Sequence, residues 1–250
     1  MKILVIADIH GNATALEAVL NKEHDADRII FLGDAVLPGP QPNETIALMR
    51  GMCDGTYIVG NHDTEMLQPE IFANYPAQWL AFFNWVVDNF EPAGLEFLNV
   101  LFAMGDYEED GIPMRLHHGQ VDGGPRYTLP DSPDENFHLI ADGSSCPYVL
   151  FGHSHVQFTR RIGKQTFINP GSIGQNRCGK QVACYGLFED GVYRQGEVPF
   201  DIRPWLDALD KVDTLDAFPD FKAWIRDGLV NGYGVGESEP WTRYAAEGYS

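Results

Sequence analysis

The sequence predicts an α/β fold built around a largely parallel β-sheet. The chain has 250 residues, 44% apolar and 21% charged, so it can form a sizeable core in one or two domains. Through the first sixty residues, short apolar runs alternate with helical patterns in the order strand, helix, strand, helix, strand. This alternation is typical of parallel strands joined by helices.

The first five elements follow from local patterns. One helix carries Leu16, Val19 and Leu20 on a single side, and the next begins after Pro42 with Asn43 as its predicted N-cap. The strands between them are short apolar runs that end in polar residues. We expect strands over 2–7, 28–32 and 55–59, and helices over 12–23 and 43–50.

Between residues 64 and 111 the pattern becomes helical and rich in aromatic residues. An aromatic stripe with this spacing is more often part of a core than a cage around a ligand. We therefore expect a helical insertion over about 64–111 that forms a cap on the main body. Its apolar positions include Trp79, Phe82, Phe83, Trp85 and Phe90.

Strands return after residue 111. Gly163-Lys164 and Asp190-Gly191 are turn signals that predict two hairpins. These strands complete a first domain over 1–202, and we expect the tail over 203–250 to be a surface extension that packs on the same domain. The predicted strands cover 114–118, 148–151, 159–162, 165–168, 183–188 and 192–198.

The chain is strongly acidic, with 36 acidic and 17 basic residues and a formal net charge of −19. This charge disfavours a nucleic-acid polymer or an anionic membrane surface as partner, although plain solubility explains it equally well. The first apolar run stops at Asp8, too early for a secretory leader, and no run approaches the roughly 20 residues of a membrane span. Four cysteines without paired spacing predict reduced thiols in a cytoplasmic protein.

Polar clusters of one kind follow five of the predicted strands. Ligands of an open α/β sheet gather outside the carboxyl ends of its strands, so these distant clusters are expected to meet at one edge. Six of the eight histidines lie in them. The clusters are Asp8-Ile9-His10, Gly33-Asp34, Gly60-Asn61-His62-Asp63, His117-His118-Gly119 and Gly152-His153-Ser154-His155.

Each cluster alone also suits an N-cap, a turn or a polar strand edge. Together they offer imidazole, carboxylate and carboxamide groups without a thiolate, a set that suits Mn, Fe, Zn or Ni. The candidates outnumber the ligands of one ion, so we expect two divalent ions, with manganese as the first choice. Ions about 3.5 to 4 Å apart need a shared carboxylate, and Asp34, central in chain order, is the candidate bridge.

In this order the clusters resemble the signature of the calcineurin-like metallophosphoesterase superfamily. Asn169-Pro170-Gly171-Ser172 also resembles a loop of its bacterial phosphodiesterase-like branch, and the resemblance spans about residues 1–172. It implies a four-layer α/β sandwich, with two mixed β-sheets face to face and helices outside. It also implies a metal-dependent phosphoesterase, a phosphodiesterase or phosphatase in which hydroxide bridging two ions is the nucleophile.

The resemblance implies a role for each matching residue. His62 resembles the histidine that assists the leaving group, an effect worth about 10²- to 10⁴-fold, and Asp63 positions the catalytic loop beside it. Adjacent strand residues face opposite sides, so only one of His117 and His118 can reach the ions, and His118, which precedes Gly119, is favoured. The implied ligands are Asp8, His10, Asp34 and His155 for the first ion, and Asp34, Asn61, His118 and His153 for the second.

The second cluster departs from the protein phosphatases of the superfamily, which carry Gly-Asp-Tyr-Val-Asp-Arg-Gly. This chain has Gly33-Asp34-Ala35-Val36-Leu37-Pro38-Gly39, and the missing second acid and arginine argue against a protein phosphatase. One phosphodiesterase branch has cysteine where this chain has His62, so phosphomonoesters and diesters both stay open.

Two further residues are candidate substrate contacts. Asn12 lies at a helix start, where an amide and free backbone N–H groups can meet phosphate, and its alternative role is an N-cap. Arg177 can offer a guanidinium to phosphate, and its alternative role is a solvated surface arginine.

The expected function is hydrolysis of a small phosphorylated substrate, with nucleotides as one class. A non-catalytic metal-binding scaffold or protein-interaction module with the same fold is the alternative, and it predicts eroded motifs. Here His62 and every ligand position are intact. A homo-oligomer joined through the aromatic insertion and the tail is compatible with either hypothesis.

Overall fold

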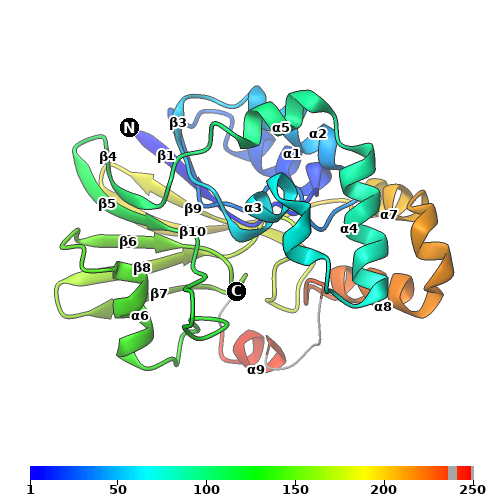
Figure 1. The fold of residues 1–250 in the computed structure, drawn as a ribbon. Helices are drawn as coiled ribbons and strands as arrows, with labels where there is room; N and C mark the ends of the chain where they lie inside the picture. Colours follow the sequence, from blue (N-terminus) through cyan, green and yellow to red (C-terminus); the bar gives the residue numbers. More distant parts are fainter. Residues whose placement is uncertain (236–240, 249–250) are drawn as a thin grey trace.

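Two mixed β-sheets pack face to face in the computed structural model, which describes residues 1–235 and 241–248 (Figure 1). Within these residues each sheet has five strands. The first has the order β10 (Val192–Pro199), β9 (Val182–Glu189), β1 (Lys2–Ile6), β2 (Arg28–Phe31), β3 (Gly55–Tyr57). The second has the order β4 (Gly105–Glu109), β5 (Ile112–His117), β6 (Tyr148–Phe151), β8 (Gln165–Pro170), β7 (Gln157–Ile162).

Each sheet contains three neighbouring parallel strands, with antiparallel strands on one side of them in the first sheet and on both sides in the second. β1, β2 and β3 run parallel, as do β5, β6 and β8, whereas β9, β4 and β7 pair antiparallel with their neighbours. The expected mixed sheets and the two hairpins, β7–β8 and β9–β10, are therefore confirmed.

Strand β1 shows how alternating side chains build the layers. Leu4 and Ile6 pack in the core beneath the outer helices, whereas Ile3, Val5 and Ala7 pack in the core between the two sheets. All five are at most 1% exposed, because successive residues of a strand point to opposite faces and both faces are covered. The expected four-layer sandwich follows directly.

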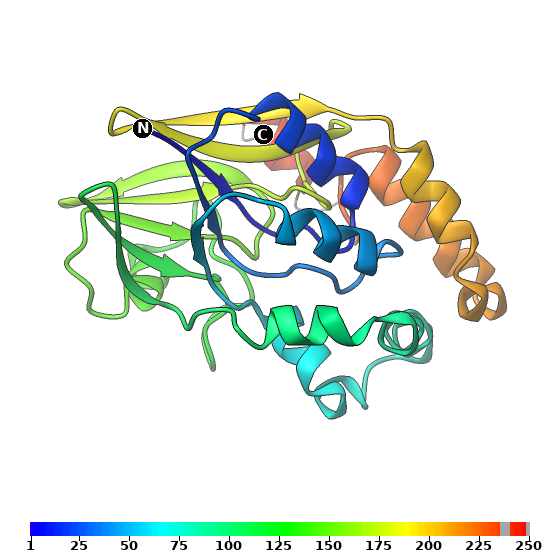
Figure 2. The same ribbon diagram turned by 90° about the horizontal axis from the view of Figure 1, so that it is seen from above.

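Helices α1 (Ala13–Lys22) and α2 (Pro42–Arg50) cover the outer face of the first sheet (Figure 2). The prediction that Asn43 is the N-cap of the second helix is wrong, because the helix already begins at Pro42 with Gln41 in the cap position. The Asn43 side chain instead holds the start of another helix: it donates to the carbonyl of Asn89 and accepts from the backbone N–H of Glu91.

The aromatic segment forms α3 (Asn61–Leu67), a 3₁₀ turn (Pro69–Phe72), α4 (Ala77–Asn89) and α5 (Pro92–Leu98). Phe82, Phe83 and Val86 are buried in the main core, as predicted for this stripe. The predicted helical boundary at about residue 111 is too late, however. Strand β4 begins at Gly105 and pairs with β5, because the chain returns to the edge of the second sheet soon after α5 ends.

Helix α6 (Asp134–Ala141), which the sequence analysis did not identify, covers the outer face of the second sheet. Phe137 and Ile140 pack there with Phe151, Phe158 and Phe167 of the strands. Two residues of α9 (Trp241–Ala246), Trp241 and Tyr244, join the same cluster.

The tail contains α7 (Arg203–Asp210), a 3₁₀ turn (Asp213–Ala217), α8 (Pro219–Val230) and α9, and residues 236–240 and 249–250 of the predicted extension lie outside the described residues. It packs on the body, but the expectation of a surface extension is wrong. Trp205, Leu209 and Ile225 are at most 1% exposed and belong to the main core, where α7 and α8 lie at the same end of the molecule as the insertion (Figure 2). No helix in the described part of the chain is long and apolar enough to cross a bilayer.

Candidate active site

The polar clusters that follow β1, β2, β3, β5 and β6 meet at one rim where the two sheets face each other. The backbone N–H of Asp8 donates to the carbonyl of Gly33 at 3.0 Å, which joins the ends of β1 and β2. Across the sheets, the carboxylate of Asp8 accepts from the N–H of His153 at 3.0 and 3.2 Å. The expected convergence of sequence-distant clusters is thus present, and both sheets contribute to it.

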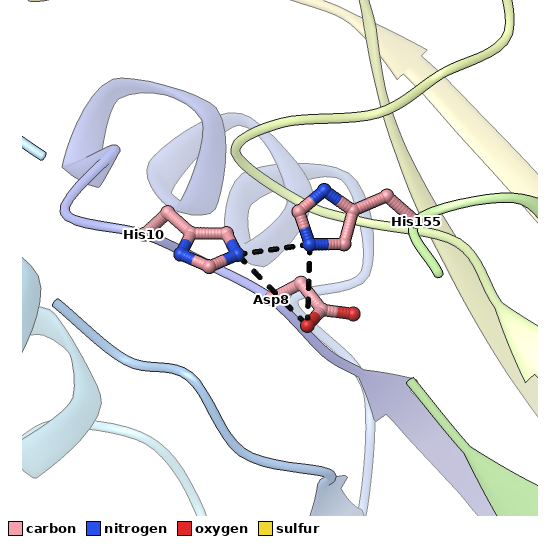
Figure 3. Close-up of side chains that lie close together, drawn as sticks. All are labelled: Asp8, His10 and His155. Carbon is pink, nitrogen blue, oxygen red and sulfur yellow. Dashed lines mark hydrogen bonds and ion pairs between the residues drawn. The ribbon is translucent and has the colours of Figure 1, made fainter. Parts of the chain in front are cut away.

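One group of ligand atoms consists of Asp8, His10 and His155 (Figure 3). Nε2 of His155 lies 3.6 Å and Nε2 of His10 lies 3.9 Å from Oδ1 of Asp8. The two Nε2 atoms are 3.0 Å apart. All three side chains are buried, so the group is shielded from competing water.

A second group consists of Asp34, His118 and His153. Nε2 of His118 lies 3.2 Å from Oδ2 of Asp34 and 2.9 Å from Oδ1 of Asn61. The same Oδ2 of Asp34 lies 3.9 Å from Nε2 of His10, in the first group. The carboxylate of Asp34 therefore faces both groups.

Each of these histidines is oriented by a backbone carbonyl on the far side of its ring. Nδ1 of His118 faces the carbonyl of Leu32 at 2.8 Å, Nδ1 of His155 faces that of Gln175 at 2.9 Å, and Nδ1 of His10 faces that of Leu37. A carbonyl accepts only, so each Nδ1 carries a proton, and in the neutral rings of His10 and His155 the Nε2 atom presents a lone pair to the centre. His153 is reversed: its Nε2 donates to the carbonyl of Arg126 at 3.0 Å, which frees Nδ1.

This arrangement fits a metal centre. Two lone pairs 3.0 Å apart, on His10 and His155, repel each other unless a cation or a proton lies between or beside them. Carbonyl partners on the outer ring nitrogens are the usual support for metal-ligating imidazoles. Carboxylates complete each group, so the donor set suits a divalent ion of borderline hardness.

Backbone conformation also marks the centre. Eight non-glycine residues in the described chain have a positive φ, and three of them are aspartates that precede glycine in turns. The other five, with φ between 49° and 66°, are all predicted ligands. Left-handed conformations at non-glycine residues are costly and persist at sites where the surroundings enforce them. These five residues are Asp8, His10, Asp34, His153 and His155.

The protonation of the metal-free centre follows from burial and charge. Burial lowers the pKa of His10 and of His153 to about 3, so both rings are neutral and able to ligate at neutral pH. Burial also lowers the pKa of His118, but the carboxylates of Asp34 and Asp8 outweigh it and raise this pKa to about 10. The pKa of Asp8 rises to about 8, chiefly through burial.

A model of the calcineurin-like phosphoesterase superfamily domain matches residues 1–190. The chain belongs to this superfamily. The predicted family and its fold are thereby confirmed, and with the clustered ligand atoms they make the protein a metal-dependent phosphoesterase.

The chain is similar to other proteins of known sequence or structure. An uncharacterized protein of Methanocaldococcus jannaschii is 31% identical over 225 residues, which cover 80% of this chain and 88% of the relative. A hypothetical protein from Pyrococcus horikoshii superposes with a TM-score of 0.78 at 19% identity, covering 94% of this chain and 99% of the other. A metallophosphoesterase from Sphaerobacter thermophilus superposes with a TM-score of 0.69 at 24% identity, covering 93% of this chain and 100% of the other.

Asp63 of this phosphoesterase holds the loops that carry the ligands. Its fully buried carboxylate accepts three backbone N–H groups, from Asp34, Ala35 and Gly60, each at 2.8 Å. It does not line the cavity in front of the centre. Asp63 thus has the geometry of a positioning residue, as expected of its place in the loop, and not that of a group that touches substrate.

His62 lines the cavity and has a partner that sequence reasoning missed. Nδ1 of His62 lies 2.6 Å from Oε2 of Glu65, whose Oε1 accepts from the hydroxyl of Tyr75 at 2.9 Å. Burial lowers the pKa of His62, but the carboxylates of Asp34 and Glu65 outweigh it and leave the pKa raised. Because Glu65 follows His62 by three residues on α3, helical spacing was the available signal.

The two predicted substrate contacts have different outcomes. Arg177 is buried and lines the cavity, so the alternative of a solvated surface arginine is wrong. Asn12 caps α1: its Oδ1 accepts from the N–H of Ala15 and its Nδ2 donates to the carbonyl of Gly174. It is fully buried and does not line the cavity, so the expected phosphate contact by Asn12 is not supported, and its N-cap alternative is the one observed.

The doubled histidine is also resolved by geometry. His118 reaches the centre, whereas Nδ1 of His117 accepts from the N–H of Gly119 at 2.9 Å and His117 belongs to neither ligand group. The two residues lie at the end of β5 and point to opposite sides, which is why only one of them faces Asp34.

Proposed function

We propose that this phosphoesterase binds two divalent ions that share Asp34 and hydrolyses a small phosphorylated substrate. The observation that carries the proposal is the position of Oδ2 of Asp34, 3.9 Å from Nε2 of His10 in one group and 3.2 Å from Nε2 of His118 in the other. A single carboxylate facing two sets of imidazoles is the arrangement that a two-metal site requires.

Each ion has a proposed ligand set drawn from this geometry. Manganese is the first choice, with iron, zinc and nickel as alternatives, because every donor is a nitrogen or an oxygen. When bound, divalent ions lower the pKa of water toward about 7 and offset negative charge on a phosphoryl group. The proposed ligands are Asp8, His10, Asp34 and His155 for one ion, and Asp34, Asn61, His118 and His153 for the other.

The protein's own side chains supply the remaining chemistry. His62, held through Nδ1 by Glu65, directs Nε2 toward the leaving group and donates a proton to the departing oxygen. Arg177 offers its guanidinium to a phosphoryl oxygen. Asp63 keeps the backbone of Asp34 and Gly60 in register with these groups.

The substrate is proposed to be a small molecule, either a phosphomonoester or a phosphodiester. The cavity in front of the centre has a volume of about 780 Å³, within the roughly 300 to 1,000 Å³ typical of small-ligand sites. The net charge of −19 works against a nucleic-acid polymer as substrate. A non-catalytic scaffold predicts eroded ligand positions, whereas all seven proposed ligands are retained at the rim. Cytoplasmic localisation and homo-oligomer formation stay predictions.

Hydrolysis of chromogenic phosphoesters tests the proposal. Purified protein is freed of metal, reloaded with Mn²⁺, Fe²⁺, Zn²⁺ or Ni²⁺, and assayed with a monoester and a diester of p-nitrophenol. We expect turnover that depends on the added ion and is abolished in Asp34→Asn, together with weaker metal loading. Absence of turnover with every ion, or near-normal turnover and metal content in Asp34→Asn, would overturn it.

A further inference from the structure

The cavity extends well beyond the metal-binding groups and ends against aromatic side chains. These come from three segments outside the rim: the insertion, the loop after β5, and the tail. Among the residues that line the cavity, Val121 and Val235 are the aliphatic members other than proline, whereas six are aromatic. The aromatic members are Tyr75, Trp79, Phe83, Tyr127, Trp224 and Trp241.

Two of these aromatic side chains, Trp79 of α4 in the insertion and Trp224 of α8 in the tail, lie next to each other in the wall of the cavity. They are half-buried, with ring centroids 6.1 Å apart and ring planes at 84°. Phe221, which does not line the cavity, stacks on Trp224 at 25° and meets Trp79 at 74°. Packing of α4 against the tail therefore fixes two large flat rings at the cavity surface.

Arg177, another residue that lines the cavity, provides a positive charge in place of an apolar surface. Its guanidinium carbon lies 4.0 Å from the ring centroid of Trp241 and 5.1 Å from that of Tyr127. Nη1 donates to the carbonyl of Ser154, between two proposed ligands, whereas the buried Nε has no hydrogen-bond partner. A residue only 6% exposed thus brings a positive charge to the cavity.

We propose that the substrate is a nucleoside phosphoester, with its phosphoryl group between the rim and Arg177 and its base against Trp79 and Trp224. The inference rests on the proposed function for the position of the phosphoryl group. Flat aromatic walls favour a planar π system over a flexible alkyl chain, for which aliphatic side chains are the usual lining. Loss of one base-stacking contact lowers affinity by roughly 5- to 150-fold.

A matched pair of substrates isolates the base. Thymidine 5′-(p-nitrophenyl phosphate) and methyl p-nitrophenyl phosphate release the same leaving group and differ only in the other ester group. We expect kcat/KM of the thymidine ester to exceed that of the methyl ester by roughly 5- to 150-fold. In Trp79→Ala this ratio falls toward one. Trp85→Ala is the matched control, because Trp85 is a half-buried tryptophan of α4 that does not line the cavity, and it keeps the wild-type ratio.

An equilibrium measurement covers the case of a strict monoesterase. Calorimetry on the Mn²⁺-loaded and the metal-free protein gives the Kd of thymidine 5′-monophosphate and of methyl phosphate. We expect the nucleotide to bind more tightly than methyl phosphate, and we expect this difference to be lost in Trp79→Ala and kept in Trp85→Ala. Such binding supports the inference even if no ester is hydrolysed. The absence of hydrolysis would overturn the proposed function alone. Equal Kd values together with equal kcat/KM values would overturn the inference and leave the proposed function standing.

Discussion

The carboxylate of Glu65 lies 2.6 Å from Nδ1 of His62, one helical turn along α3. The second cluster of this chain lacks the additional acid and the arginine that the protein phosphatases of the superfamily carry there. Glu65 and Arg177, which lie in other segments, line the cavity in front of the centre. The pairing fixes the ring of His62 so that Nε2 faces away from Glu65.

We predict that Glu65→Gln lowers turnover most for substrates with poor leaving groups. A carboxylate on Nδ1 orients His62 and stabilises its protonated form, and proton donation matters more as the leaving oxygen becomes more basic. The loss should approach the roughly 10²- to 10⁴-fold value of general acid catalysis for alkyl esters and be small for p-nitrophenyl esters. A series of aryl and alkyl phosphates measures this dependence. Glu70→Gln, at an exposed position nearby, is the control. An equal loss for all leaving groups would assign Glu65 a structural role.

Asp63→Asn is predicted to destabilise the fold by about 2 to 4 kcal/mol. The Asp63 carboxylate accepts three backbone N–H groups, and an amide would turn its NH₂ group toward at least one of them. Urea unfolding of the metal-free protein measures the free energy of unfolding. Asp88→Asn, at an exposed position, should change it by no more than about 0.5 kcal/mol. A similarly small change for Asp63→Asn would show that the three hydrogen bonds are replaceable.

Metal binding is predicted to release protons and to strengthen as the pH rises. An ion needs neutral imidazole, but the pKa of His118 in the metal-free centre is raised to about 10, so at neutral pH its proton must leave. Below that pKa the binding constant should rise about tenfold per pH unit for each proton released. Calorimetry in buffers of different ionisation enthalpy counts those protons. An affinity that is constant between pH 6 and pH 9 contradicts the protonation state described for His118.

Arg177→Lys is predicted to lower kcat/KM by roughly 10- to 150-fold, the value of a hydrogen bond to a charged group. Lysine keeps the charge but not the planar guanidinium that packs against Trp241 at 4.0 Å and Tyr127 at 5.1 Å. Arg161→Lys, at an exposed position on β7, serves as the control. Wild-type kinetics in Arg177→Lys would remove Arg177 from the substrate site.

The sequence predicted the rim because each ligand follows a strand directly. Asp8 and Asp34 come after apolar runs of parallel strands, whose carboxyl ends must share an edge, and the histidines after the later strands follow the same rule. Burial on both sheet faces made these strands readable as continuous apolar runs.

The walls of the cavity could not be predicted in the same way. Glu65 and Tyr75 lay in a segment assigned to a separate cap, and their contact with His62 depends on how α3 meets the following loop. Trp241 reaches Arg177 only because the tail crosses to the second sheet, a long-range packing that no local pattern encodes. Helix α6 was missed because its eight residues are too few for the 3.6-residue repeat of apolar side chains to be recognised.

The most direct measurement of the central claim is the anomalous scattering of crystals grown with Mn²⁺. We predict two peaks about 3.5 to 4 Å apart, one on each side of the Asp34 carboxylate, with His10 beside one and His118 beside the other. A single peak, or two peaks of which only one contacts Asp34, would contradict it.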